Sequence, residues 1–248
     1  MAKKERIDAL LVQRGLAASR DRAKRLLLAG KVLVDDTPVD KAGTRVLVDA
    51  AIRLRGEDHP YASRGGLKLA GALSDLSVEV VGLRCLDVGA STGGFTDCLL
   101  QRGATEVVAV DVGTNQLHNK LRQEPRVRSF EQTDIRDLQT DQLGGPIDLV
   151  VVDASFISLR LLLPPIARLI GPGTRVLALV KPQFEVGREL VGRGGVVKDD
   201  AVRRGAVDAI AAVAQELGFE ELGRCESQVA GARSGNREVF LMVGLETQ

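Results

Sequence analysis

The sequence predicts an α/β protein, with a doubly wound, Rossmann-like sheet preceded by a small α+β domain. Its length of 248 residues suits one small and one medium domain. From Arg84 onward, short apolar runs alternate with helical patterns in the manner of βαβ units. Residues 1–31 hold nine Lys or Arg against three Asp or Glu, a charge of +6 in a chain whose net charge is +1. We expect a first domain over residues 1–56, a polar linker over 57–61 and a second domain over 62–248.

The composition argues against several classes of protein. No apolar run approaches the ~18 residues that a membrane span needs, and the basic N-terminus is followed by an amphipathic segment, unlike a signal peptide. We therefore expect a soluble, cytoplasmic protein. The three cysteines, Cys85, Cys98 and Cys225, are scattered without metal-ligand spacing, and the chain has only two histidines. Reduced thiols and no metal site are expected.

The N-terminal segment predicts two short helices and a small β unit. Residues 6–14 have apolar side chains at helical spacing and stop at Gly15. A second helix begins after the N-cap Ser19 and runs through Ala29 to Gly30. A tight hairpin over residues 32–39 and two more short strands over 46–48 and 52–54 follow.

The second of these helices carries four basic residues within six positions, which is typical either of a solvated face or of a surface that binds polyanions. The run GLAASRDRAKRLLLAGKVLVDDTPV resembles the RNA-binding fold of small-subunit ribosomal protein four, over residues 5–56. The resemblance implies that this region binds phosphates of folded RNA. The candidate RNA-binding residues are Arg6, Arg20, Lys24, Arg25, Lys31 and, in the second domain, Arg64. Base stacking by the N-terminal domain is not implied, because the segment has no aromatic residue.

A glycine-rich turn follows the first strand of the second domain. The run Asp87-Val88-Gly89-Ala90-Ser91-Thr92-Gly93-Gly94-Phe95 lies between a strand and a helix, where backbone can approach a ligand closely. Its glycines do not match the dinucleotide fingerprint, and a carboxylate at Asp87 would repel a pyrophosphate but suits a cation or an amino group. S-adenosylmethionine, which carries a sulfonium and an amino group but no phosphate, is the expected cofactor. A turn without a ligand and an NAD site are the alternatives.

Two further acids extend this cofactor site. Asp111 ends the next strand and is placed to accept the ribose hydroxyls, as acids do in nucleotide-binding folds. Asp134 follows a third short strand and could receive the adenine amino group. The candidate cofactor-binding residues are thus Asp87, Gly89, Ser91, Gly93, Gly94, Phe95, Asp111 and Asp134.

Four charged residues lie where a reaction centre is expected. Asp153 and Lys181 directly follow buried strands, beyond whose carboxyl ends ligands bind in doubly wound sheets. Lys68 lies near the start of an amphipathic helix, and Glu238 precedes the last strand. A ribose hydroxyl is a poor nucleophile, so methyl transfer to it needs accurate positioning and a group that accepts or polarises its proton.

These four residues resemble the Lys-Asp-Lys-Glu tetrad of the FtsJ class of RNA ribose 2′-O-methyltransferases. With the basic N-terminal domain included, residues 5–245 are similar to the TlyA family, known as haemolysin-like proteins and as rRNA cytidine 2′-O-methyltransferases. The resemblance implies that Lys181 is the base or activator of the hydroxyl and that Asp153 orients Lys181, while Lys68 and Glu238 complete the pocket. It also implies ribosomal RNA or ribosomal subunits as partners.

Three points stay open at this level. The glycine-rich, basic segment 187–197 could close over RNA or be a surface loop without function. A ribosome-assembly factor with a non-catalytic methyltransferase fold and a membrane-active haemolysin are the other functions considered. The second of these is disfavoured, because the chain has no Trp and one Tyr to anchor an amphipathic helix in a membrane.

Overall fold

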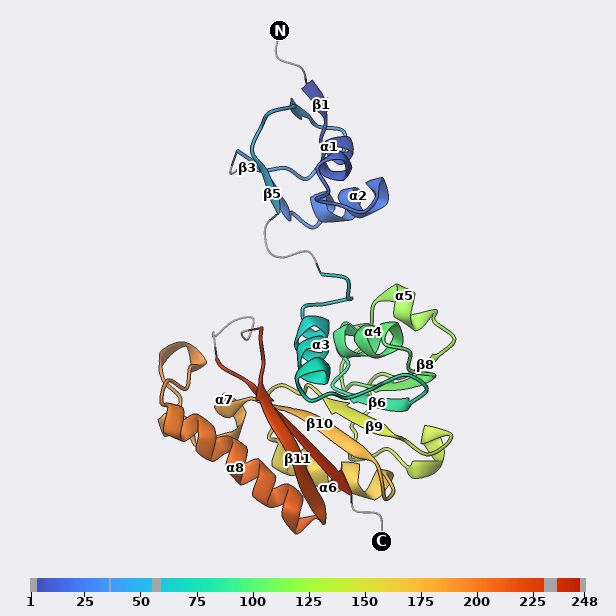
Figure 1. Ribbon diagram of the computed structural model, residues 1–248, viewed down its shortest axis with the longest axis vertical. Coiled ribbons are helices and arrows are strands. Elements are labelled where there is room, and N and C mark those ends of the chain that lie inside the picture. Colours follow the sequence, from blue (N-terminus) through green and yellow to red (C-terminus); the bar gives the residue numbers. More distant parts are fainter. Residues whose placement is uncertain (1–3, 36, 55–58, 230–235, 246–248) are drawn as a thin grey trace. The chain divides into compact units, whose positions relative to one another are not determined.

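The computed structural model describes residues 4–35, 37–54, 59–229 and 236–245 (Figure 1). The chain divides into two compact units, residues 1–60 and residues 61–248. Residues 57 and 58 of the expected linker lie outside the described residues.

The first unit is a small α+β structure. Two antiparallel sheets, β1–β4 and β3–β2–β5, accompany two helices whose apolar faces supply most of one core. The elements are β1 (Lys4–Arg6), α1 (Ile7–Gln13), α2 (Arg20–Leu28), β2 (Val32–Val34), β3 (Thr37–Pro38), β4 (Arg45–Leu47) and β5 (Ile52–Leu54).

Local chemistry sets the ends of these helices. The Ser19 hydroxyl accepts a hydrogen bond from the backbone N–H of Arg22, as an N-cap should. Gly15 and Gly30, which follow the helices, have φ of +71° and +64°, so each occupies the left-handed region that favours glycine. Both predicted helices are confirmed. The strand β1 was not predicted, because three residues are too few to show an alternating pattern.

The second unit is built on a seven-stranded sheet of order β11-β12-β10-β9-β6-β7-β8. The five strands from β10 to β8 are parallel, and β12 is antiparallel to both of its neighbours. The strands are β6 (Arg84–Val88), β7 (Glu106–Val110), β8 (Val127–Phe130), β9 (Leu149–Val152), β10 (Arg175–Val180), β11 (Phe219–Glu226) and β12 (Val239–Leu245). The doubly wound fold class is confirmed.

Helices cover both faces of this sheet (Figure 1). Alternate strand residues point to opposite faces and form two apolar clusters, one with α6 and α8 and the other with α3, α4 and α5. The helices are α3 (Gly65–Asp75), α4 (Gly94–Gln101), α5 (Asn119–Arg122), α6 (Leu159–Leu169), α7 (Pro182–Glu185) and α8 (Asp200–Glu216). Three short 3-10 turns are η1 (Thr140–Leu143), η2 (Arg188–Leu190) and η3 (Arg193–Gly195).

The strand order reverses between β6 and β9. From β6 the chain winds outward through β7 to β8, whereas β9 and β10 lie on its other side. Ligands of doubly wound folds bind beyond the carboxyl ends of the strands at such a switch point. The topology therefore predicts a ligand site formed by the residues that follow β6, β7, β9 and β10.

Candidate active site

A cavity of about 1120 Å³ lies at the carboxyl ends of these four strands. All residues that line it belong to the second unit. They include the four predicted catalytic residues, Lys68, Asp153, Lys181 and Glu238. The structure thus brings together side chains that are up to 170 positions apart in the sequence.

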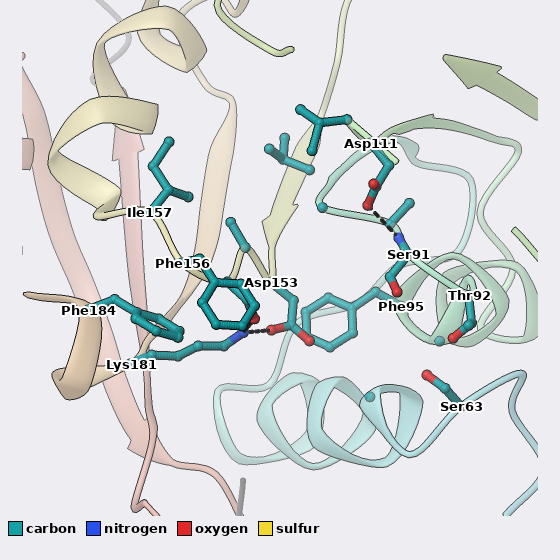
Figure 2. A pocket seen from close by; sticks show the side chains of 18 of the residues that line it. Ser63, Ser91, Thr92, Phe95, Asp111, Asp153, Phe156, Ile157, Lys181 and Phe184 are labelled. Carbon is teal, nitrogen blue, oxygen red and sulfur yellow. Dashed lines mark hydrogen bonds and ion pairs between the residues drawn. The ribbon is translucent and has the colours of Figure 1, made fainter. Parts of the chain in front are cut away.

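Lys181 directly follows β10, and Asp153 directly follows the neighbouring strand β9. The Lys181 Nζ lies 2.6 Å from Asp153 Oδ1 (Figure 2). The same ammonium group donates a hydrogen bond of 2.8 Å to the Ser155 hydroxyl. The Lys181 side chain is only 8% exposed, so these two partners fix the direction in which its nitrogen points.

A second ion pair contributes to the cavity wall. Lys68 on α3 donates to Glu238 Oε2 at 2.5 Å, and the two side chains are 11% and 4% exposed. The Glu238 carbonyl also accepts a hydrogen bond from Ser227 N–H. Two amines and two carboxylates therefore share one cavity, and each amine is neutralised by its own carboxylate.

The glycine-rich turn lies on the other side of the cavity, between β6 and α4. Gly89 has φ of +83°, and a Cβ placed there would lie 2.9 Å from the Asp153 carbonyl oxygen. Ser91 also has a positive φ, of +48°. Its N–H donates to Asp111 Oδ2 at 2.8 Å (Figure 2). The Gly113 N–H donates to Asp111 Oδ1 at 2.7 Å. The turn is thus tied to the end of β7.

Six of the eight residues predicted to bind a cofactor line the cavity. They are Gly89, Ser91, Gly94, Phe95, Asp111 and Asp134. The Phe95 ring is largely buried and stacks on Phe240, with ring centroids 6.1 Å apart, so only part of it faces the cavity.

Asp87 and Gly93 do not line the cavity. Asp87 is completely buried between the sheet and α4, where Thr96 Oγ1 donates to its Oδ2 at 2.6 Å. Its Oδ1 has no hydrogen-bond partner among the described residues. Burial raises the pKa of Asp87 from 3.8 to about 7. A Cβ on Gly93 would overlap Leu117 and Leu121, so this glycine serves close packing.

Asp134 has a partner that the sequence analysis did not anticipate. Arg136 donates to its two oxygens at 2.9 and 2.6 Å, and the Arg136 N–H donates as well. These bonds from Arg136 lower the pKa of Asp134. The Asp134 carboxylate is therefore anionic. A ligand can bind to the lone pairs of its oxygens that the bonds from Arg136 do not use.

Several residues of the site were missed. Phe156 is 86% exposed with φ of +66°, and its ring centroid lies 5.3 Å from that of Phe184 beside Lys181 (Figure 2). Glu131 accepts hydrogen bonds from the N–H groups of residues 115, 116 and 117 and so fixes the loop that carries Gln116 into the cavity. Both phenylalanines lie just after the ends of strands, in the sequences ASFIS and KPQFE. This position was the feature of the sequence that could have indicated them as site residues.

The candidate RNA-binding residues fall into two sets. Arg20, Lys24 and Arg25 are exposed on α2 and Lys31 is half-buried just after it. Arg6 donates to the buried carboxylate of Asp8 at 3.0 Å, so its charge is partly neutralised. In the second unit, the exposed Arg64 lines the cavity.

Neither a metal-binding cluster nor a membrane-spanning helix is found among the described residues. No group of three or more His, Cys, Asp or Glu side chains is arranged to hold a metal ion. No helix among them has both the length and the apolar character that a membrane crossing requires.

Known proteins share both units of this chain. The FtsJ-like methyltransferase family matches residues 61–245, and the S4 domain family matches residues 5–52. A protein of Mycobacterium tuberculosis named 16S/23S rRNA (cytidine-2′-O)-methyltransferase TlyA is 48% identical over 248 residues, which are 100% of this chain and 92% of that protein. Hemolysin A of Brachyspira hyodysenteriae is 37% identical, over 94% of this chain and 97% of its own.

A solved structure agrees with these matches. A protein from Streptococcus thermophilus that carries the name hemolysin superposes with a TM-score of 0.76 at 41% identity, covering 100% of this chain and 90% of that one. The chain belongs to the FtsJ-like methyltransferase family and carries an S4 domain at its N-terminal side.

Proposed function

We propose that this chain transfers a methyl group from S-adenosylmethionine to the 2′-hydroxyl of a cytidine ribose in ribosomal RNA, in the cytoplasm. The observation that carries the proposal is the pair of ion pairs, Lys181–Asp153 and Lys68–Glu238, in one cavity beside the glycine-rich turn. The base and the RNA class follow the name of the M. tuberculosis relative.

The residues present fit this cofactor. Each oxygen of the Asp111 carboxylate accepts one backbone N–H, and a carboxylate oxygen can accept two hydrogen bonds, so a ribose diol can still bind. A Cβ on Gly89 would meet the Asp153 carbonyl and one on Gly94 would meet Ser63, so these glycines let the turn lie close against its neighbours in the protein. Asp134 would receive the adenine amino group through the lone pairs that Arg136 leaves free. The bound cofactor supplies an electrophilic methyl group.

Asp87 would act through its charge, since it does not reach the cavity. The carboxylate lies beneath the turn, and a cation bound above it stabilises the ionised form. Cofactor binding is thus linked to loss of the Asp87 proton. This assigns to Asp87 an electrostatic role in place of direct contact.

Lys181 and Asp153 would prepare the hydroxyl group. Asp153 and Ser155 hold the Lys181 nitrogen in place, so it can contact a ribose oxygen that enters the cavity beside it. An amine accepts the hydroxyl proton only in its neutral form, whereas the ammonium form polarises the hydroxyl by donating to its oxygen. Holding the hydroxyl in line with the methyl carbon can lower the barrier by ~7–11 kcal/mol. Lys68 and Glu238 would complete the wall of the cavity.

RNA would be bound at two places. In the S4 domain, phosphates would be bound by the cations of α2 and of neighbouring parts of the chain, which are Arg20, Lys24, Arg25, Lys31 and Arg6. In the second unit, Arg64 would bind phosphate at the cavity. At the cavity mouth, the exposed ring of Phe156 offers a face on which an unstacked base can lie.

The test is methyl incorporation into purified 16S and 23S rRNA or ribosomal subunits, with mass-spectrometric mapping of the methylated nucleosides. Lys181→Ala should abolish incorporation while leaving RNA affinity within about threefold. Lys120→Ala, at an exposed lysine of α5 outside the cavity, is the matched control and should retain activity. Equal loss of incorporation and RNA affinity in Lys181→Ala would favour a non-catalytic RNA-binding factor. Absence of incorporation with the unaltered protein, together with leakage of liposomes, would favour a membrane-active protein.

A further inference from the structure

Asn236 connects the wall of the cavity to a segment at its rim. It lies two residues before Glu238 and is only 1% exposed. Its Nδ2 donates to the Gly195 carbonyl at 2.8 Å, and its Oδ1 accepts from Val197 N–H at 2.9 Å. Both atoms of one amide group are thus bonded to a segment about 40 positions earlier in the chain.

This rim segment, Gly192–Val197, lies between α7 and α8 (Figure 1). Gly192 N–H donates to the Val196 carbonyl at 2.9 Å, which closes a tight loop with Arg193 exposed on it. Gly194 and Gly195 have φ of +76° and +78° and line the cavity. A Cβ on either would have no described atom within 4 Å, so these glycines are required by the backbone conformation and not by lack of space.

The side chain at position 236 must both donate and accept. An aspartate could accept from Val197 N–H, but its second oxygen would face the Gly195 carbonyl and repel it. An apolar residue would leave the buried Val197 N–H and the partly buried Gly195 carbonyl without their partner, which is costly. An asparagine with both bonds formed therefore fixes the rim segment relative to Glu238, which follows it closely in the chain.

We propose that Asn236 is a positioning residue that holds the rim segment in the conformation that binds the RNA backbone at the cavity mouth, with Arg193 as the phosphate contact. The inference rests on the proposed function for the identity of the ligand. RNA is a polyanion, and an exposed guanidinium on a glycine loop can contact its phosphates closely. Asn236 itself touches neither cofactor nor substrate.

Limited trypsin digestion tests the positioning role without RNA or cofactor. Trypsin cleaves after Arg193 only when the rim segment opens. Asn236→Leu keeps the branched shape and the number of side-chain heavy atoms but has no polar atoms, so it removes both hydrogen bonds and should speed cleavage there by about tenfold. Asn119→Ala, at an exposed asparagine of α5, is the control and should be cleaved at the unaltered rate. An unchanged rate in Asn236→Leu would overturn the proposal.

Measurements of RNA binding test the second part of the proposal, that the rim segment binds RNA. With purified 23S and 16S rRNA, Asn236→Leu should raise the Kd and the KM about tenfold, while kcat and the affinity for S-adenosylmethionine stay within about threefold. Gly195→Ala strains the same segment from within and should show the same pattern, which covers the case in which Asn236→Leu does not fold. The double variant should be no weaker than the weaker single one, since both act through one segment.

Arg193→Ala should weaken RNA binding and reduce the slope of log K against log salt by about one. Faster cleavage with unchanged RNA affinity would overturn the assignment of the rim segment to RNA. If the unaltered protein methylates no rRNA, the proposed function fails, whereas digestion and RNA affinity still report on Asn236.

Discussion

Lys68 and Glu238 are 170 positions apart in the sequence, and their charged groups meet at 2.5 Å in the wall of the cavity. Lys68 comes from the first helix of the second unit, and Glu238 comes from the residue just before its last strand. Both side chains are largely removed from water, so each depends on the other to offset the cost of burying a charge.

Removing one member of this pair should be costly. Glu238→Gln keeps the shape but leaves the Lys68 ammonium without a counter-charge, and we expect a loss of ~3–5 kcal/mol in the free energy of unfolding. Adding Lys68→Met should recover much of the loss. Denaturant unfolding of both single variants and the double variant measures the coupling. The exposed pair Lys24–Asp21 is the control, and Lys24→Met should cost less than ~1 kcal/mol. Equal losses at the two pairs would contradict this account.

Gly89→Ala should be more harmful than the same change at another glycine with equal φ. Gly89 and Gly173 both have φ of +83°, but only at Gly89 would the new Cβ meet a neighbour, the Asp153 carbonyl oxygen at 2.9 Å. We expect Gly173→Ala to cost ~1–2 kcal/mol from backbone strain alone. Gly89→Ala should cost more, and it should weaken S-adenosylmethionine binding because the new Cβ pushes the glycine-rich turn away from its place at the cavity. Urea unfolding and calorimetry measure the two effects, and equal costs would show that the close approach is unimportant.

Asp87 should make stability depend on pH. Its pKa is 3.8 when unfolded and about 7 when folded, so between these values the folded state holds a proton that the unfolded state releases. Its contribution to stability is therefore largest at acidic pH, falls as the pH rises from about 4 to about 7, and is constant above that. Asp87→Asn, which does not titrate, should remove this part of the slope and be more stable than the unaltered protein at pH 8.

The measurement is the difference in unfolding free energy between Asp87→Asn and the unaltered protein at pH 5 and pH 8. We expect the difference to grow by a few kcal/mol in favour of Asp87→Asn, because each unit of pKa shift corresponds to about 1.4 kcal/mol. Other groups titrate in both proteins and cancel. A difference that is the same at both pH values would show that Asp87 is not perturbed.

Phe156 should matter for RNA and not for stability. Its ring is 86% exposed, so Phe156→Ala removes little buried surface and should change Tm by no more than ~2 °C. Loss of one stacked base should lower kcat/KM for rRNA by about 10–100-fold. Phe156→Tyr keeps the aromatic face and should retain most activity. Full activity of Phe156→Ala would remove the ring from the substrate site.

The sequence was most informative where buried strands end in a charged residue or a glycine. The strands β6, β7 and β10 each end directly before a predicted site residue, because their apolar runs stop abruptly at Gly89, Asp111 and Lys181. Asp153 and Lys181 meet in one cavity because they follow neighbouring parallel strands, whereas Lys68 reaches it from a helix and Glu238 from the residue before an antiparallel strand. Their roles in catalysis remain to be tested.

Side-chain direction was less predictable. Asp87 shares a sheet face with Cys85, so it points under α4 and not into the cavity, although its place before the turn resembles a ligand contact. The bond between Asp134 and Arg136 and the exposure of Phe156 depend on local backbone angles, which pattern does not reveal. The hydrogen bonds of Asn236 were not predictable either, because its partners lie about 40 positions away in the chain.

The place of β12 in the sheet has a consequence for biosynthesis. This strand, the last to be synthesised of the seven, is inserted between β10 and β11. A nascent chain that still lacks residues 239–245 leaves β11 without its neighbour in the sheet and β10 paired with β9 alone, and it lacks the strand that fixes Glu238 against Lys68. The part of the cavity wall that Glu238 forms can therefore be completed only once β12 has joined the sheet.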